Sequence, residues 1–167
     1  DCKHFFTPLN MENQGIVPRD GNVEKLSDKA ISIFGERNER LLKLFLKQIQ
    51  KKDYPITFLD YGAGDAHVSR TFKQLLGTKA KIYCLEADPA FQHFYQKYEL
   101  IQISTLNELR EKIDFIYMIE VVEHVEDPIA TMKDLIKYLN KDGLIFLSTP
   151  LGTRIENKTN AYNTPSH

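Results

Sequence analysis

The stretch from Ile56 to Val68 reads ITFLDYGAGDAHV and decides the fold. Its apolar residues are typical of a buried strand, which ends in the acidic residue Asp60 and is followed by Gly62, Gly64 and a run with helical character. Glycines let a backbone approach a ligand closely, and the free N–H groups at the start of a helix bind anionic groups. This order of strand, glycine turn and helix indicates a nucleotide-type cofactor site. The alternative is a tight turn that binds nothing.

The glycine spacing indicates which cofactor is bound. A dinucleotide fingerprint needs a third glycine at position 67, where this chain has His67, so a nicotinamide-dependent oxidoreductase is disfavoured. The remaining pattern, D-x-G-x-G-x-A, ends at Ala66 and resembles the first motif of the S-adenosylmethionine-dependent methyltransferases with a Rossmann-like fold. The resemblance implies that the site for S-adenosyl-L-methionine includes Asp60, Gly62, Ala63 and Gly64.

A second apolar run ends in an acidic residue 22 positions after Gly64, where Lys81 to Ala87 reads KIYCLEA. In a β-α-β unit, a carboxylate at this place meets the ribose hydroxyls of a bound nucleoside, because two acceptor oxygens suit a vicinal diol. An ordinary turn or helix cap from Glu86 to Pro89 is the alternative. The spacing favours the ribose role for Glu86, with Ala87 also in the cofactor site.

The segment from Asp114 to Pro128 reads DFIYMIEVVEHVEDP, a strand followed by E-x-x-E-H-x-x-D-P. It resembles the fourth-strand region of small-molecule methyltransferases grouped with the ubiquinone-pathway O-methyltransferases. This resemblance covers about residues 56–150, with a turn of Lys141, Asp142 and Gly143 where the family typically has proline-glycine-glycine. It implies further cofactor-binding residues, namely Thr105 beside the adenine, and Ile119 and Glu120 beside the methionine part.

The resemblance implies methyl transfer to a small-molecule acceptor, at a hydroxyl oxygen. A hydroxyl acceptor must lose a proton, and His124 is the candidate base because histidine exchanges protons near neutral pH. We therefore expect His124 and Glu120, one helical turn apart, to be the catalytic residues. The alternatives are a structural role for His124 at a helix start, and a scaffold domain that keeps the fold and the cofactor without turnover.

A metal-assisted reaction is a further alternative. Glu120, Glu123 and His124 would share one face of a helical turn, and His167 follows downstream. This is similar to the small-RNA 3′-end 2′-O-methyltransferases, in which E-x-x-E-H and a later histidine hold a divalent ion. The net charge of −1 and the lack of an evident aromatic-basic stripe argue against RNA. We therefore assign no metal and expect no nucleic-acid partner.

The composition narrows the function classes. The chain of 167 residues is long enough for one domain with a core. Residues 1–53 carry 10 basic and 8 acidic side chains and the rest 12 and 15, so neither part is strongly basic. No apolar run approaches the roughly 20 residues that span a bilayer, so we expect no membrane partner. Two unpatterned cysteines, Cys2 and Cys84, fit a reducing, cytoplasmic setting.

The order of patterns predicts the architecture. Residues 1–25 are rich in turn formers and predict an irregular arm or lid, and residues 26–167 form the predicted methyltransferase domain. We expect a short helix from Ser27 to Phe34 and an amphipathic helix from Glu36 to Lys51. Alternating strands and helices then predict a doubly wound α/β Rossmann-like fold, whose mainly parallel sheet has the order 3-2-1-4-5 and helices on both faces.

The ends of the chain suggest a truncated domain. It starts without methionine and stops soon after the fifth predicted strand, whereas methyltransferases of this type usually continue with two more strands. An exposed edge of the fifth strand favours pairing with a second chain. We therefore expect a possible homo-oligomer through that edge.

Overall fold

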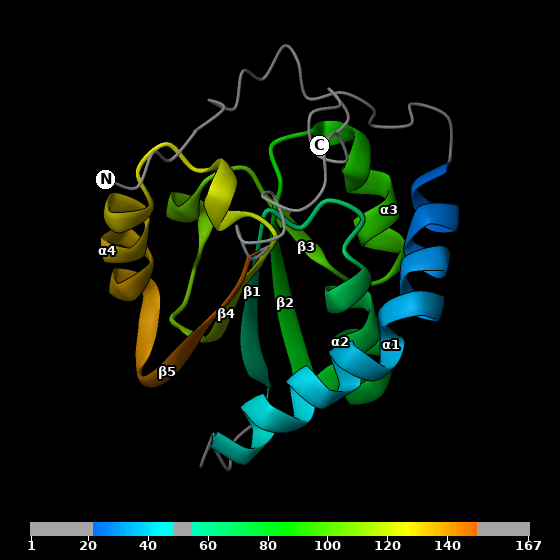
Figure 1. Ribbon diagram of the computed structural model, residues 1–167, viewed down its shortest axis with the longest axis horizontal. Coiled ribbons are helices and arrows are strands. Elements are labelled where there is room, and N and C mark those ends of the chain that lie inside the picture. Colours follow the sequence, from blue (N-terminus) through cyan, green and yellow to red (C-terminus); the bar gives the residue numbers. More distant parts are fainter. Residues whose placement is uncertain (1–21, 49–54, 150–167) are drawn as a thin grey trace, which may run out of the picture.

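The computed structural model describes residues 22–48 and 55–149, which form a parallel sheet covered by helices (Figure 1). The strands are β1 (Ile56–Tyr61), β2 (Ala80–Leu85), β3 (Ile101–Ile103), β4 (Ile113–Ile119) and β5 (Leu139–Ser148). The helices are α1 (Asn22–Gln48), α2 (His67–Leu76), α3 (Gln92–Lys97) and α4 (Pro128–Tyr138). Four 3₁₀ turns lie between them: η1 (Gly77–Lys79), η2 (Pro89–Phe91), η3 (Leu106–Glu108) and η4 (Val122–His124). The sheet order β3-β2-β1-β4-β5 confirms the predicted fold class.

The two faces of the sheet are covered differently. Helices α1, α2 and α3 lie on one face and α4 lies on the other (Figure 1). On the α1 face the core is aromatic: Phe45 of α1 stacks on Phe115 of β4 with ring centroids 4.4 Å apart, and Phe72 of α2 packs against both Phe45 and Phe58. On the other face, α4 contributes a single fully buried side chain, Leu135.

The prediction of two helices before the first strand is wrong, because α1 is continuous from residue 22 to residue 48. Ser27 is fully buried inside the helix and does not cap it. Gly35 is also helical, since the burial of Leu41, Leu42 and Phe45 offsets the weak helix propensity of one glycine. Residues 22–25, assigned to the arm, belong to this helix, and the rest of the predicted arm lies outside the described residues.

The predicted turn at residues 141–143 is part of β5. Ile113 of β4 pairs with Leu139, and Phe115 pairs with Leu144, so the ladder is irregular between these two points. A Cβ at Gly143 would lie 2.9 Å from the Ile113 carbonyl oxygen, which explains a glycine at this place. The strand β5 lies at one edge of the described sheet, and association through that edge stays a prediction. Among the described residues, no helix has the length and apolarity to cross a membrane.

Candidate functional site

The glycine turn joins the carboxyl end of β1 to α2 and is fixed from two sides. The amides of Gly62 and Ala63 donate to the Leu85 carbonyl of β2 at 3.1 and 3.3 Å. Gly62 has φ +75°, and a Cβ there would lie 2.7 Å from a methyl group of Val121. By contrast, a Cβ at Gly64 (φ +49°) would have no atom within 4 Å. Gly62 therefore allows tight packing against the segment after β4, whereas Gly64 borders open space.

Glu86, at the end of β2, faces this turn. Its carboxylate accepts a hydrogen bond from the Gly64 amide at 3.2 Å and another from the Asp88 amide at 3.1 Å. Gln102 of β3 donates to the carbonyl oxygens of Glu86 and Asp88 at 2.9 and 2.8 Å. The carboxylate predicted for ribose binding is thus held next to the open side of the glycine turn, and Ala87 is exposed beside it. Sequence patterns did not single out Gln102.

Tyr95 of α3 is a second support that the sequence analysis missed. Its side chain is fully buried, and its ring stacks on Phe91 with the ring centroids 5.7 Å apart. Its hydroxyl donates a hydrogen bond to the Gly64 carbonyl at 2.5 Å. Burial raises the pKa of Tyr95 well above its usual value, so the hydroxyl stays a donor. In sequence, Tyr95 is one of several aromatic residues in a short helix, and nothing in that pattern indicates contact with the turn.

Asp60 lies beneath the turn rather than on its open side. Its carboxylate is 6% exposed and accepts a hydrogen bond from Ser69 of α2 at 2.7 Å; the Ser69 hydroxyl also bonds Tyr117 at 2.8 Å. Burial raises the pKa of Asp60 to about 7, and the nearby charges of Asp65 and Glu86 act in the same direction. The structure therefore places Asp60 as a support of the turn.

The first turn of α2 follows Ala66, which has φ +52° and no side-chain cap. His67 does not point to the open side: its Nδ1 accepts a hydrogen bond from Asn38 of α1 at 3.1 Å, and its ring lies 5.7 Å from Phe34. Burial lowers the pKa of His67, although the carboxylate of Asp65 opposes this. The His67 amide donates to the Asp65 carboxylate at 3.3 Å, so only the other amides of the first turn remain candidates for binding an anionic group.

The segment after β4 leaves the strand abruptly. Glu120 has φ +58°, its side chain is exposed, and its amide donates to the Ser148 carbonyl at 2.7 Å. Since η4 begins only at Val122, Glu120 does not share a helical turn with Glu123 and His124. No metal-binding group of acidic, histidine and cysteine side chains forms among the residues that the structure describes. His167 of the alternative metal hypothesis lies outside them.

The remaining predicted cofactor residues lie at the same edge of the sheet. Thr105 is exposed just after β3, where its amide donates to Glu108 at 2.8 Å and so caps η3. Hydrogen bonds from the backbone amides of Thr105 and Ser104 lower the pKa of Glu108. Ile119 is half-buried at the end of β4. The predicted cofactor residues thus lie at the carboxyl ends of four neighbouring strands.

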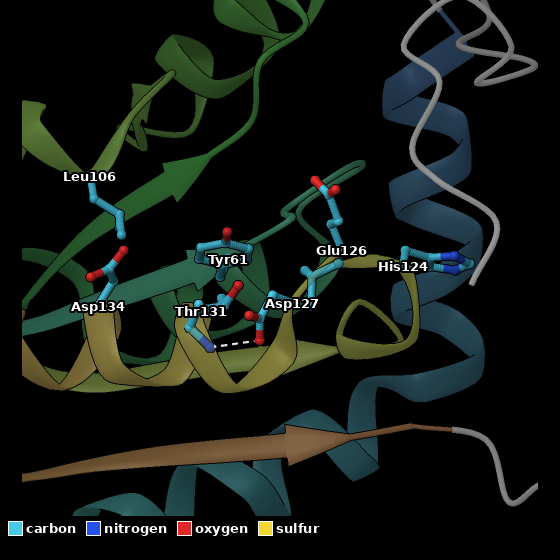
Figure 2. Close-up of a pocket in the computed structure, with 9 residues that line it drawn as sticks. Tyr61, Leu106, His124, Glu126, Asp127, Thr131 and Asp134 are labelled. Atoms are coloured by element: carbon cyan, nitrogen blue, oxygen red, sulfur yellow. Dashed lines mark hydrogen bonds between the residues drawn. The ribbon is translucent and has the colours of Figure 1, made fainter. Parts of the chain in front are cut away.

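A pocket of about 450 Å³ opens on the α4 side of this edge (Figure 2). It is lined by Tyr61, Leu106, His124, Val125, Glu126, Asp127, Ala130, Thr131 and Asp134. Asp127 accepts from the Ala130 amide at 2.9 Å, and Asp134 pairs with Lys137 at 2.6 Å. Burial, and secondarily the charge of Asp134, raise the pKa of Tyr61. The predicted base His124 is exposed at this pocket, and the acidic lining suits neutral or cationic groups.

This fold and site define a class of protein. A parallel sheet of order 3-2-1-4-5, with a glycine turn after β1 and a carboxylate after β2, is the arrangement expected of a Rossmann-like methyltransferase. Residues 33–165 match the family described as a methyltransferase domain. The chain therefore belongs to the methyltransferase domain family, which confirms the predicted class.

Solved structures support the fold. The plantazolicin methyltransferase, solved with a desmethyl plantazolicin analogue and SAH, aligns with a TM-score of 0.63 at 18% identity, over 84% of this chain and 56% of that one. Coclaurine N-methyltransferase, also solved with SAH, aligns with a TM-score of 0.54 at 20% identity, over 67% of this chain and 35% of that one.

Curated relatives correct the prediction of the partner. The chain is 30% identical over 121 residues to the tRNA U34 carboxymethyltransferase of Campylobacter lari. The aligned region covers 65% of this chain and 39% of that relative. It is 32% identical over 80 residues to that of Aliarcobacter butzleri, covering 46% and 26%. The prediction of a small-molecule acceptor and no nucleic acid is thus contradicted. The small-molecule acceptor was predicted from the resemblance, and the lack of a nucleic-acid partner from the net charge and the lack of an evident aromatic-basic stripe. A net charge says little about charge on one face.

Proposed function

We propose that this chain binds S-adenosylmethionine at the carboxyl ends of β1, β2 and β4, and that it takes part in transferring the activated carbon group to a nucleobase in RNA. The observation that carries the proposal is the open space at Gly64, bordered by the Glu86 carboxylate only 3.2 Å from the Gly64 amide. A glycine with open space at its Cβ position, and a carboxylate with two acceptor oxygens beside it, suit a nucleoside ligand whose ribose lies on Glu86.

The other predicted residues complete the proposed cofactor site. Asp60, Gly62 and Ala63 support the glycine turn, since their contacts are with β2, α2 and the segment after β4. The residues proposed to surround the remainder of the cofactor are Ala87 and Thr105 for the adenine, and Ile119 and Glu120 for the methionine part. Apart from the His67 amide, which donates to Asp65, the first turn of α2 would offer donors to the methionine carboxylate.

Bound S-adenosylmethionine supplies a methyl group on a positively charged sulfur, from which a nucleophile displaces it. The protein has to hold both reactants at reacting distance and exclude water. His124, exposed at the pocket, would accept the proton that the acceptor loses. Glu120 leaves the strand at the same place, with its carboxylate free to orient the acceptor.

RNA is proposed as the acceptor because the curated relatives are tRNA enzymes by name. The chain spans 39% of the length of the relative from Campylobacter lari. Carboxymethyl transfer is a second candidate, favoured by the same names. It would require an S-adenosyl donor whose transferred methyl group carries a carboxylate.

The test begins with calorimetric titration of S-adenosylhomocysteine into matched glycine variants. Gly64 and Gly77 both have positive φ, and a Cβ at either would have no atom within 4 Å, but they lie at opposite ends of α2. Asparagine tolerates a positive φ best among larger residues. Gly77 has ψ −128°, outside the left-handed helical region, so Gly77→Asn tests the effect of backbone strain at the far end of α2 without adding an atom to the glycine turn. We expect Gly64→Asn to weaken binding at least about tenfold through steric exclusion, and Gly77→Asn to leave it within about twofold.

Transfer is then assayed with a tRNA transcript carrying uridine at position 34, using S-adenosylmethionine and its carboxylated analogue in separate reactions. Incorporation of label into the RNA, lost in His124→Ala with cofactor affinity intact, supports the proposal. A wild-type chain that binds neither S-adenosylmethionine nor S-adenosylhomocysteine would overturn it.

A further inference from the structure

The outer face of α1 carries a row of basic side chains that the methyltransferase site does not explain. Lys29, Arg40 and Lys47 are separated by 11 and 7 residues, so at 3.6 residues per turn they lie almost in line. All three are exposed, and Arg37 is exposed about 80° around the helix from their line. The row from Lys29 to Lys47 extends for about 27 Å along the helix, because each residue adds about 1.5 Å. We call Lys29, Arg37, Arg40 and Lys47 the α1 basic row.

Two acidic residues of α1, Glu24 and Asp28, are paired with residues outside the helix, and Glu39 lies 4.0 Å from Lys43. Glu36, seven residues after Lys29, lies in line with the row. Glu24 accepts hydrogen bonds from Lys97 and from Tyr98 beyond α3, both at 2.7 Å. Asp28 pairs with Arg70 of α2 at 2.6 Å. These two carboxylates connect α1 to α2 and α3, and each is paired with a cation of those helices.

Among the described residues, most cations of the α1 basic row are not neutralised by a neighbouring carboxylate. Glu36 reaches Arg40 at 3.4 Å as an exposed pair, which is worth little. Lys29, Arg37 and Lys47 have no acidic partner within the part of the chain that the structure describes. The helix therefore presents a net positive outer face, although the whole chain has a net charge of −1.

The middle of the row lies next to the candidate site. The Arg37 guanidinium lies 4.6 Å from the centroid of the Phe34 ring, and that ring lies 5.7 Å from His67, the first residue of α2. The charge of Arg37 reaches His67 and contributes to its lowered pKa. Phe34 is 38% exposed, so a cation and an aromatic surface lie together at the border of the site.

The other flank of the site has the opposite charge. Its pocket is lined by Glu126, Asp127 and Asp134, and Glu120 and Glu123 lie just before it. Phosphates are repelled by such a surface, whereas an uncharged base is not. An RNA whose base reaches the strand ends thus needs its backbone on the α1 side.

We propose that the α1 basic row is the surface on which the phosphate backbone of the RNA acceptor docks. This inference rests on the proposed function, since it assumes that the acceptor is RNA. Phosphate contacts of this kind fix the position of the RNA and do not select its sequence. The exposed side chains of Leu26, Ile33 and Leu44 on the same side of α1 would also suit an anionic membrane, so the test includes one.

The test compares two triple variants with the same change in net charge. Lys29→Gln/Arg37→Gln/Lys47→Gln removes three charges of the row, and Arg110→Gln/Lys133→Gln/Lys141→Gln removes three exposed charges elsewhere. Binding of a tRNA transcript is measured by fluorescence anisotropy between 50 and 200 mM salt. Each lost phosphate contact lowers the slope of log K against log salt by about one. We expect the slope of log K against log salt to be smaller by about two to three in the α1 variant than in the wild type. We also expect the α1 variant to bind the tRNA at least about tenfold more weakly at 100 mM salt.

The control variant should keep both the slope and the affinity, and both variants should bind S-adenosylhomocysteine like the wild type. If the wild type binds the tRNA and both triple variants bind equally well, the docking surface is wrong and the RNA acceptor stands. If the wild type binds S-adenosylhomocysteine but no RNA, the proposal that RNA is the acceptor is wrong, and so is this inference. Binding to phosphatidylserine vesicles in place of RNA, lost in the α1 variant, would assign the row to a membrane and overturn the inference.

Discussion

Asp114 and Asp60 are both almost wholly buried in the sheet, 5% and 6% exposed, but they lie at opposite edges. Asp114 begins β4 at the amino edge, where its carboxylate accepts from the Thr57 amide at 2.8 Å, the Thr57 hydroxyl at 2.9 Å and Asn140 at 2.6 Å. Asp60 ends β1 at the carboxyl edge, where Ser69 donates to it at 2.7 Å. The amino edge therefore compensates its buried charge far better than the carboxyl edge does.

The backbone repeats this difference. Two non-glycine residues with positive φ, Ala66 and Glu120, lie at the carboxyl edge, directly after the glycine turn and after β4. The third described non-glycine residue with positive φ is Glu99, which lies between α3 and β3, away from the site. Strained backbone and poorly compensated carboxylates cost stability, and they persist where an open site requires them. One edge of the sheet thus contributes stability, and the other gives up part of it for binding.

The largest effect is expected from breaking the amino edge. Asp114→Ala removes the acceptor of the buried Thr57 amide and of Asn140, while the Thr57 hydroxyl keeps the Lys112 carbonyl at 3.0 Å. This should cost about 3–5 kcal/mol of unfolding free energy. Urea denaturation at pH 7 measures this loss. The exposed Asp142→Ala should stay within about 0.5 kcal/mol of the wild type. A loss below about 1 kcal/mol for Asp114→Ala would show that the amino edge is not the stabilising one.

An intermediate effect is expected from pH at the carboxyl edge. Burial raises the pKa of Asp60 to about 7 from an ordinary value of 3.8, so the folded chain holds a proton that the unfolded chain releases earlier. The stabilising contribution is therefore complete below about pH 4 and is lost as pH rises through about 7. Relative to wild type, Asp60→Asn should gain about 2–4 kcal/mol of unfolding free energy between pH 4 and 8.

This difference isolates Asp60, because all other titrating groups are shared by the two chains. Urea denaturation of both at several pH values measures it. A constant difference across the range would contradict the raised pKa of Asp60. The expected sign is opposite to the effect of Asp114→Ala, which makes the two aspartates a direct test of the comparison between the edges.

Local patterns predicted the strands and their order, because apolar runs and turn residues bounded each element. The strand ends at Asp60, Glu86 and Ile119 were accordingly placed at one edge, where the structure has them. Supports that depend on tertiary contact were not predictable. Tyr95 and Gln102 reach the turn and the loop beside it from α3 and β3, and no spacing in the sequence indicates those contacts.

The predictions of a helix break before residue 36 and of a helical turn at Glu120 were wrong, because each assumed the conformation that is most common for a short sequence pattern. Ser27 and Gly35 are usual at helix ends, but packing of α1 on α2 and β4 keeps the helix continuous through both. Glu120 was placed in a helical turn with His124, whereas its positive φ ends the strand before η4 begins. The prediction of the partner was wrong for a different reason, because a net charge summed along the chain carries no information about how the charges are distributed over the surface.

The smallest effect is expected from relieving backbone strain at Glu120. Glu120→Gly removes the cost of a positive φ and adds chain entropy to the unfolded state, so the net gain should be at most about 1 kcal/mol, or a rise in Tm of about 2–4 °C. Glu99→Gly is the matched control, since it relieves a φ of +53° away from the site. It also removes the ion pair between the exposed Glu99 carboxylate and the largely buried Lys73. Calorimetry should show similar small shifts for both variants.

The two variants should separate when transfer to RNA is assayed. Glu120→Gly removes a carboxylate that lies at the end of β4, beside the candidate cofactor site, whereas Glu99→Gly leaves the site unchanged. We expect slower transfer only for Glu120→Gly, together with unchanged or higher stability. Loss of activity without loss of stability is the behaviour expected of an edge that keeps strain for function. Equal activity of the two variants would mean that the strain at Glu120 serves only the path of the chain between β4 and η4.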